Sequence, residues 1–362
     1  MIPFTDLKSQ YIEAKEDIDA AIQYCIDGNH FVTGPVTDHF ENLVAEYTGA
    51  EACASTGSGS TALLCALLAL DLDWTGQEII TTPHTFVSTA EAILQVGATP
   101  VFVDVYDSTF NIDCQKLELA IQSIISDKKL IPKAIIPVDL FGVPARYRVI
   151  EEIAKKYDLK IIQDAAQSFG AKIGNTKVGN FGDVAATSFY PAKPLGCYGD
   201  GGAIFTNDDN LADKCKAIRI HGTTTDRYHS ELVGLNGRLD SLQAAVLLEK
   251  LTIFDEELEM RNQVSNYYRK FLNNAQYIPK NYNSAHALFS ITLGLKKKRE
   301  EVVQRLTSNN IPSVVYYKYP IHLMKGFAYL GYKIGDFPIS EQLSETIVSL
   351  PMHPYLHERE ID

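Results

Sequence analysis

Short apolar runs alternate with helical patterns through the middle of the chain, and this alternation constrains the fold more than any other feature. The runs predict seven strands, at residues 51–55, 78–82, 101–105, 133–138, 160–163, 184–189 and 203–206. Between them, segments 88–96, 114–126 and 147–157 carry apolar residues at helical spacing. Several strands are apolar throughout, which is typical of a parallel sheet covered on both faces. Residues 50–250 are therefore predicted to form one large α/β domain.

The flanking segments are predicted to complete the architecture. We expect helices at 7–28, 241–272 and 297–309, strands at 287–293 and 313–317, and an ordered loop from residue 320 onward. The N-terminal segment and the large domain are assigned to residues 1–245. A smaller α+β domain is assigned to residues 246–362.

Composition excludes several classes of function. The net charge is −12, so a general nucleic-acid binder is not expected, and an anionic substrate needs a local cluster of donors. The six cysteines form no CxxC pair and have no His/Cys ligand spacing, which argues against a metal site and favours a reducing cytoplasm. The N-terminus lacks the pattern of a signal peptide, and no apolar stretch reaches membrane-spanning length.

One lysine is placed unlike a surface lysine. Lys193 lies between Pro191 and Pro194, and a glycine-rich bend at 196–202 follows. Prolines fix the backbone, and glycines let other groups approach closely. This pattern indicates an amine that forms a Schiff base with an aldehyde cofactor. The alternative is a solvated loop lysine, which is the commoner state of a lysine considered alone.

Small and hydroxyl residues at 56–61 precede the strong helix former 62–70. Free backbone N–H groups at a helix start bind anions, and Ser60 and Thr61 can add side-chain hydrogen bonds. The alternative is a simple N-cap. The segment is not an ATPase loop, because it lacks the GxxxxGK[ST] motif.

Polar and aromatic residues follow three of the predicted strands. They are Asp164 after 160–163, Ser188 and Lys193 with the strand at 184–189, and His84, Thr85 and Phe86 after 78–82. Ligands in α/β sheets bind beyond the carboxyl ends of the strands, so these residues mark the expected site.

Two segments make the chain recognisable. Residues 164–171 (DAAQSFGA) and 188–193 (SFYPAK) resemble the DegT/StrS-type nucleotide-sugar aminotransferases, which are pyridoxal-phosphate enzymes of fold type I, the aspartate aminotransferase-like fold. Residues 57–70, 97–104, 236–245 and 335–338 match the same family in the same order. The resemblance thus covers nearly the whole chain.

The resemblance implies catalytic roles for Lys193 and Asp164 and a cofactor-binding role for Gln167. Lys193 would hold the pyridoxal 5′-phosphate covalently and move the proton between substrate and cofactor. Asp164 would keep the pyridine nitrogen protonated, so that the ring accepts an electron pair. The alternative for Asp164 is a strand-end turn or N-cap. Gln167 would hydrogen-bond the phenolic oxygen of the ring.

Other positions are implied to hold the cofactor. Ser60, Thr61 and Ser188 would bind its phosphate. Phe86 would stack on its ring, the alternative being a core aromatic. Asn236 would reach the phosphate of the partner subunit, with Arg238 nearby, so that a homodimer shares its active sites.

The family resemblance implies a two-step reaction. An amino acid, for which we expect L-glutamate, converts the cofactor to pyridoxamine phosphate, which then aminates a nucleotide-linked keto sugar. Residues 191–203, 227–229 and 349–355 are most similar to the branch that acts on UDP-linked 3-keto sugars. This branch includes makers of UDP-2-acetamido-3-amino-2,3-dideoxyglucuronate, a precursor of surface polysaccharide or glycan.

The acceptor sugar has two interpretations. A uronate needs a cationic group, which His229, Arg238 or His322 would supply. The branch has a His-Tyr pair near the substrate where this chain has Tyr316 and Tyr317, and a tyrosine does not neutralise a carboxylate. A dTDP- or UDP-linked 3-keto- or 4-keto-6-deoxy sugar is therefore the alternative.

Two rival functions belong to the same fold. The lysine-less sugar dehydratases of the family carry histidine at the Schiff-base position, and Lys193 argues against that chemistry. Lys193, Asp164, Gln167 and Ser188 together indicate a proton shuttle. A non-catalytic regulator would not need one. Members of the family usually continue into one more short helix where this chain ends, at Asp362.

Overall fold

A mixed sheet of seven strands forms the centre of the computed structural model, which describes residues 2–127 and 131–362. The strand order is β1-β9-β8-β5-β4-β2-β3. The bounds are β1 Ala52–Thr56, β2 Gln77–Thr81, β3 Thr99–Phe102, β4 Ile131–Ile135, β5 Lys160–Asp164, β8 Val184–Ser188 and β9 Gly202–Thr206. Strands β3, β2, β4, β5 and β8 pair in parallel, whereas β9 runs antiparallel to both of its neighbours. The predicted α/β fold with a mostly parallel sheet is confirmed.

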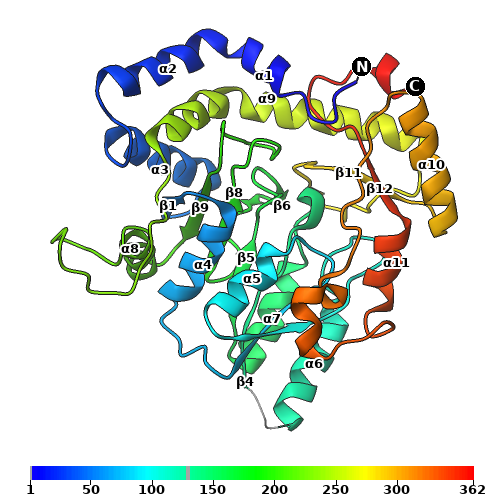
Figure 1. The fold of residues 1–362 in the computed structure, drawn as a ribbon, viewed down its shortest axis with the longest axis horizontal. Coiled ribbons are helices and arrows are strands. Elements are labelled where there is room, and N and C mark those ends of the chain that lie inside the picture. The colour runs from blue at the N-terminus through cyan, green and yellow to red at the C-terminus, as the bar shows by residue number, and fades with distance from the viewer. Residues whose placement is uncertain (1, 128–130) are drawn as a thin grey trace.

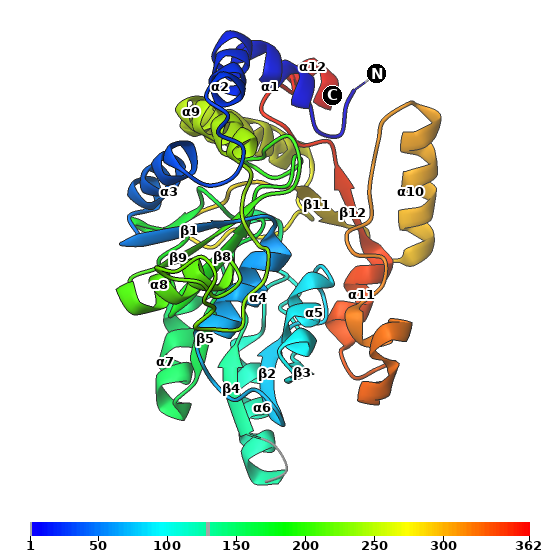
Figure 2. The same cartoon turned by 60° about the vertical axis from the view of Figure 1, so that its left-hand side comes forward.

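Helices cover both faces of this sheet (Figures 1 and 2). Successive strand residues point to opposite faces, so Val184 and Ala186 enter one core and Ala185 enters the other. The first core is closed by α4 (Gly59–Ala69), α5 (Ser88–Gln95) and α8 (Asp209–Ile218). The opposite face is covered by α3 (Pro35–Thr48), α6 (Cys114–Asp127), α7 (Tyr147–Tyr157) and α9 (Ser241–Phe271). Burial on both faces explains why several of the strands are mostly apolar.

The N-terminal segment forms two helices, so the single helix expected at 7–28 is a wrong prediction. Helix α1 (Leu7–Glu13) ends at Ala14, whose φ of −111° and ψ of 21° are not helical, and α2 (Lys15–Asp27) follows. Periodicity alone did not reveal the break, because alanine is a good helix former. Helix α2 packs along α9, as Figure 1 shows.

The second part of the chain is built on the long helix α9. This helix runs without a break through the expected boundary at residue 245. Its second half packs Val264 and Tyr268 against an antiparallel pair of strands, β11 (Phe289–Thr292) and β12 (Ile347–Leu350). The remaining elements are η1 (Leu140–Gly142), β6 (Lys172–Ile173), β7 (Thr176–Lys177), β10 (Tyr282–Asn283), α10 (Lys296–Ser308), η2 (Ile321–Leu323), η3 (Lys325–Leu330), α11 (Pro338–Thr346) and α12 (Glu358–Ile361).

The tail is more regular than expected. The strand predicted at 313–317 is reduced to a single bridge between Val314 and Ser349, and the predicted loop after residue 320 contains α11 and β12. Buried Phe327 and Phe337 supply the apolar contacts that order this segment. Its proline and glycine content therefore marked short turns between elements.

The two ends of the described chain meet (Figure 1). The backbone N–H of Met352 donates to the carbonyl of Phe4 at 3.1 Å. No helix among the described residues is long and apolar enough to cross a membrane.

Candidate active site

The predicted catalytic residues meet at the carboxyl edge of the parallel sheet. Asp164 ends β5 and Ser188 ends β8, and these two strands pair in parallel with Asp164 opposite Ala186. Lys193 follows in the connection to β9. The site therefore lies where α/β sheets bind their ligands.

Asp164 is almost fully buried, at 4% exposure. Its Oδ2 accepts a hydrogen bond of 2.7 Å from the hydroxyl of Thr89, and its Oδ1 accepts one of 3.2 Å from the N–H of Ala166. Burial raises the pKa of the Asp164 carboxyl, while Thr89, Ala166 and the charge of Lys193 act against this rise. The two hydrogen bonds thus fix the orientation of the carboxylate. Because the carboxylate is buried, a cation placed beside it would stabilise its charged form strongly.

Lys193 is poised between its charged and neutral forms. Burial lowers the pKa of its amine to about 8, and the negative charge of Asp164 opposes the shift. A lysine with this pKa carries a usable fraction of free amine near neutral pH, which nucleophilic attack on an aldehyde requires.

Gln167 is held by hydrogen bonds at both ends of its amide. Its Oε1 accepts from the N–H of Phe141 at 2.6 Å, and its Nε2 donates to the hydroxyl of Tyr317 at 2.9 Å. An amide nitrogen carries two hydrogens, so one remains for a ligand. Gln167 is therefore oriented before any ligand binds.

Aromatic rings form one wall of the site. The ring centroid of Tyr317 lies 6.2 Å from those of Phe86 and His84 and 6.4 Å from that of Phe141. Phe86 is 55% exposed, so it is not a core aromatic. This exposure leaves the ring accessible to a flat ligand, and stacking on a cofactor stays a prediction.

The start of α4 brings hydroxyl groups to the side of the site opposite the aromatic wall. Ser58 caps this helix by accepting from the N–H of Thr61 at 3.1 Å, and the hydroxyls of Ser60 and Ser88 lie 2.6 Å apart. A Cβ on Gly59 would lie 2.7 Å from that of Ser188, so only glycine lets the helix start approach Ser188 this closely. Ser60, Thr61 and Ser188 thus surround one helix N-terminus, a geometry that suits an anion, and phosphate binding there stays a prediction.

Two residues predicted to bind substrate are placed elsewhere in this subunit. His322 is buried, and its Nε2 lies 3.1 Å from Oε1 of Glu341, which also accepts from the N–H groups of Gly335 and Phe337. The expectation that His322 faces the sugar is therefore corrected to a structural role that holds the turn before α11. His229 is exposed, on the loop between α8 and α9.

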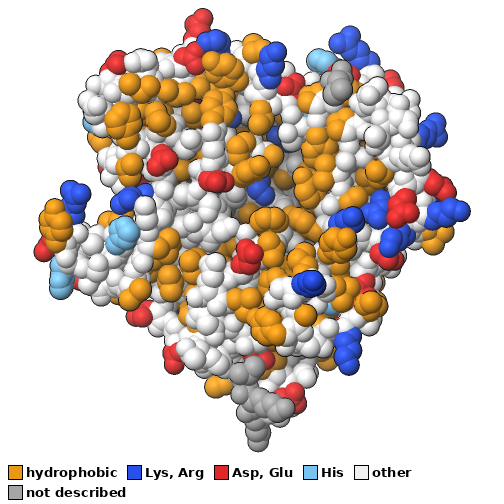
Figure 3. Space-filling view, viewed as in Figure 1, with side chains coloured by type: hydrophobic (Ala, Val, Ile, Leu, Met, Phe, Trp, Pro, Cys, Tyr) orange, Lys and Arg blue, Asp and Glu red, His pale blue; other side chains and the backbone are white. Residues whose placement is uncertain are grey.

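That loop projects from the body of the subunit on the left of Figure 1. Its Tyr228 and Val233 are 89% and 91% exposed, and hydrophobic side chains are also numerous on the face in Figure 3. A cavity of about 1180 Å³ lies beside the loop and is lined in part by Arg219, Arg227 and Arg238. Asn236 is exposed close to it.

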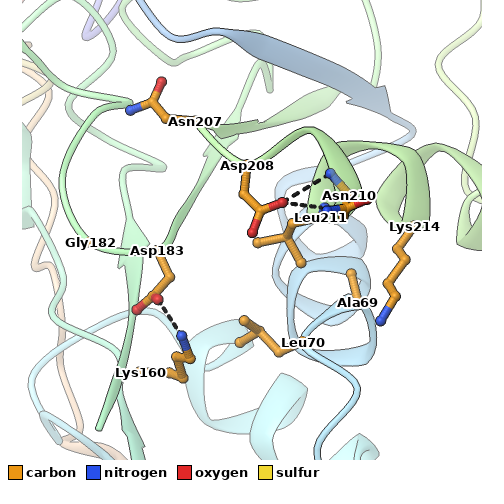
Figure 4. A pocket seen from close by; sticks show the side chains of 10 residues that line it. All are labelled: Ala69, Leu70, Lys160, Gly182, Asp183, Asn207, Asp208, Asn210, Leu211 and Lys214. Carbon is orange, nitrogen blue, oxygen red and sulfur yellow. Dashed lines mark hydrogen bonds and ion pairs between the residues drawn. The ribbon is translucent and has the colours of Figure 1, made fainter. Parts of the chain in front are cut away.

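A second cavity, of about 370 Å³, lies at the opposite end of the strands (Figure 4). Its Lys160 pairs with Asp183 at 2.7 Å, and Lys214 pairs with Asp71 at 3.1 Å. Asp208 caps α8 by accepting from two backbone N–H groups. These charged groups are already engaged, and they lie far along the strands from Asp164, so this cavity is not the active site.

The described residues offer no group of three or more His, Cys, Asp and Glu side chains that could hold a metal ion. The six cysteines are free and buried.

Sequence reasoning missed two residues of the site, Thr89, which holds Asp164, and Ser88, which meets Ser60. His84, which the sequence placed at the expected site, lies fully buried against Tyr317, and neither ring nitrogen has a hydrogen-bond partner among the described residues. The signal for Ser88 and Thr89 was the cluster of three hydroxyl residues, with Thr85, at a helix start. Nothing in the sequence indicated their contacts.

Comparisons with known proteins agree with this geometry. The sequence model of the DegT/DnrJ/EryC1/StrS aminotransferase family matches residues 12–362. The chain is 41% identical to the UDP-2-acetamido-2-deoxy-3-oxo-D-glucuronate aminotransferase of Pseudomonas aeruginosa, over 98% of this chain and 96% of that one. It is 39% identical to a pleiotropic regulatory protein of Geobacillus stearothermophilus, over 99% and 95%. Among solved structures, a DegT DnrJ EryC1 StrS aminotransferase of Brucella abortus superimposes with a TM-score of 0.96 at 42% identity, covering 100% of this chain and 97% of that one.

Proposed function

The chain belongs to the DegT/DnrJ/EryC1/StrS aminotransferase family, and from this membership we propose that it moves an amino group from L-glutamate to a nucleotide-linked keto sugar. The proposed acceptor is a UDP-linked 3-keto sugar such as UDP-2-acetamido-2-deoxy-3-keto-glucuronate. The proposed cofactor is pyridoxal 5′-phosphate, and the product serves surface polysaccharide or glycan synthesis.

The donor set of the site fits this cofactor. A buried carboxylate, a half-buried amine with a lowered pKa and an oriented amide suit the ring nitrogen, the aldehyde and the phenolic oxygen, and Asp164, Lys193 and Gln167 supply them in that order. The start of α4, which Gly59 brings against Ser188, suits the phosphate. The exposed ring of Phe86 suits the cofactor face.

When bound, pyridoxal phosphate accepts the electron pair that is released when the C–H bond of the amino donor breaks. The residues of this chain then have separate tasks. Asp164 would stabilise a positive charge at the ring nitrogen, and the hydrogen bond from Thr89 would keep the carboxylate oriented. Lys193 would take the proton from the donor carbon and deliver it to the carbon that had carried the aldehyde.

The pair formed by half-buried Lys193 and buried Asp164 carries the proposal. The amine has its pKa lowered to about 8 and interacts electrostatically with a fixed carboxylate at the carboxyl edge of the sheet. A regulator that only binds a ligand has no use for an amine held near its half-charged state. This argument favours the enzyme over the regulatory function suggested by the G. stearothermophilus relative.

We further propose a homodimer with shared active sites. The loop between α8 and α9 exposes Tyr228 and Val233, which are large apolar side chains that a second subunit would cover. Asn236, Arg238 and His229 lie on or after this loop. In the dimer, Asn236 of the partner subunit would bind the phosphate, and Arg238 and His229 of the partner subunit would approach the sugar.

Tyr316 and Tyr317 bear on the acceptor. The hydroxyl of Tyr317 is engaged by Gln167, whereas Tyr316 is half-buried beside Phe4. Tyr316 can hydrogen-bond a sugar hydroxyl but cannot neutralise a uronate, so a uronate would depend on Arg238 or His229. A dTDP- or UDP-linked 3-keto- or 4-keto-6-deoxy sugar remains the second candidate for this reason.

The test is spectroscopic. Purified protein is mixed with pyridoxal phosphate, then with L-glutamate, then with each of a panel of UDP- and dTDP-linked 3-keto and 4-keto sugars. We expect a visible absorbance band that glutamate bleaches and that one keto sugar restores, and no such band in Lys193→Ala. A band that is indifferent to every amino donor would overturn the aminotransferase function.

A further inference from the structure

The connection that carries Lys193 is folded tightly on itself. The N–H of Lys193 donates to the carbonyl of Tyr190, and that of Cys197 donates to the carbonyl of Phe189, both at 2.8 Å. A Cβ on Gly196 would lie 2.5 Å from the carbonyl oxygen of Pro191. The two halves of the connection, residues 189–193 and 194–201, therefore touch through their backbones, and a shift in one half moves the other.

Helix α9 holds the second half of this connection at two points. Lys250 donates to the carbonyl of Gly196 at 2.7 Å, and its ammonium lies 4.2 Å from the ring centroid of Tyr198. About two turns earlier in the same helix, Oε1 of Gln243 accepts a hydrogen bond from the N–H of Tyr198 at 2.8 Å. Residues seven apart lie on one helix face, so α9 presents both groups to the same segment.

A lysine is an unusual residue in the buried position 250. Its side chain is fully buried, at 0% exposure, and in the described parts of the chain no carboxylate oxygen lies within 4.0 Å of its Nζ. Burial lowers the pKa of this amine to about 8. An aliphatic side chain would fill the same space without the cost of removing an ammonium from water. The contact that an aliphatic side chain could not make is the hydrogen bond to Gly196.

We propose that Lys250 is a positioning residue for Lys193: its hydrogen bond to Gly196 and its contact with Tyr198 fix the connection that aims the Lys193 amine at the site. Lys250 itself does not touch the reacting atoms. The inference rests on the proposed function, because it assigns a structural cause to the placement of the amine on which that function depends.

The test compares Lys250→Met with the same substitution at a second lysine, Lys177. Lys177 is half-buried, its pKa is likewise lowered by burial, and its ammonium lies 3.4 Å from the ring centroid of Tyr47, away from the connection. For Lys250→Met we expect the rate of cofactor attachment to Lys193, followed by visible absorbance, and kcat to fall about tenfold or more, since small misplacements of a reacting group have effects of this size. KM for glutamate should stay within about twofold. Lys177→Met should change neither rate.

A second pair of variants separates positioning from loss of folding. Lys250→Arg keeps a buried donor and should recover part of the rate, and Gln243→Leu, which loosens the same segment from its other contact, should lower the attachment rate without changing the far-UV circular dichroism of the cofactor-free protein. Attachment at the wild-type rate in both Lys250→Met and Gln243→Leu would overturn the inference. Failure of the wild-type protein itself to attach the cofactor at Lys193 would instead overturn the proposed function.

Discussion

The hydroxyl of Thr89 donates a 2.7 Å hydrogen bond to Oδ2 of Asp164, across 75 positions of sequence. Thr89 lies in the first turn of α5, and its hydroxyl is 3.3 Å from that of Thr85. This short chain of hydroxyls links the end of β2 to the end of β5. The orientation of the buried carboxylate is therefore set by the helix that follows a different strand.

Replacing Thr89 by valine removes this hydrogen bond at nearly constant volume. Burial already raises the pKa of Asp164, and loss of the donor should raise it further, because Thr89 stabilises the charged form. We expect kcat to fall about tenfold and the free energy of unfolding to fall by about 2 kcal/mol. Thr89→Ser keeps the hydroxyl and is the control. Equal activity of the valine and serine variants would contradict a role for this contact.

The pKa of Lys193 predicts a pH dependence for cofactor binding. Only the neutral amine attacks the aldehyde, so the attachment rate of cofactor-free protein should rise about tenfold per pH unit below 8 and level off above it. Rapid mixing with pyridoxal phosphate, followed by visible absorbance, measures this profile. A rate that keeps rising beyond pH 10 would show an ordinary, solvated lysine.

The same shift has a consequence for stability. The folded pKa lies below the ordinary value of 10.5, so the stabilising contribution of Lys193 is present above pH 10.5 and is lost as pH falls through about 8. In cofactor-free protein, Lys193→Met should therefore gain stability relative to wild type at pH 7, by about 1–2 kcal/mol, and lose this advantage by pH 10.5. Urea unfolding at the two pH values tests the sign.

A shared active site predicts complementation between two inactive variants. Lys193→Ala lacks the amine, and Asn236→Ala lacks the group that we expect to reach the other subunit. Mixed dimers would contain one intact site, so refolding the two variants together should restore up to about a quarter of wild-type activity, whereas each alone stays inactive. Absence of recovery, with mixed dimers demonstrated by mass spectrometry, would contradict the sharing of sites.

Arg238 distinguishes the two interpretations of the acceptor. Its Nε is buried and has no hydrogen-bond acceptor among residues 2–127 and 131–362, so the side chain can take an anionic group. If the acceptor is a uronate, Arg238→Gln should raise KM about tenfold for the uronate and about twofold or less for the uncharged UDP-linked 3-keto sugar. Equal effects on both acceptors would favour a neutral sugar.

His322 should matter for stability and not for catalysis. It is buried against Phe337 and paired with Glu341. His322→Ala should lower the free energy of unfolding by about 2 kcal/mol, through the lost pair and the cavity, while KM for the sugar stays within about twofold. A large rise in KM without loss of stability would return His322 to the substrate site.

The sequence predicted what local patterns determine. The alternation of apolar runs located the strands of the main sheet, and the strand ends located Asp164, Ser188 and Lys193. Both inferences use short-range information, namely periodicity and the position of a residue relative to a strand.

Long-range contacts decided what the sequence could not predict. Thr89 meets Asp164, and Lys250 meets Gly196, only because the sheet and α9 bring distant segments together. His322 looks like a binding residue until its burial is known. The break at Ala14 and the strand β12 have no distinct local signal, since alanine continues helices well and four residues, three of them apolar, suit a helix or a strand equally.

The central claim is that Lys193 is the amine that holds the cofactor and moves the proton. The most direct measurement is borohydride reduction of the protein mixed with pyridoxal phosphate, followed by proteolysis and mass spectrometry of the labelled peptide. The account predicts a single pyridoxyl group on Lys193, which glutamate added before the reductant removes. Labelling spread over surface lysines, or labelling of Lys193 that glutamate leaves unchanged, would contradict it.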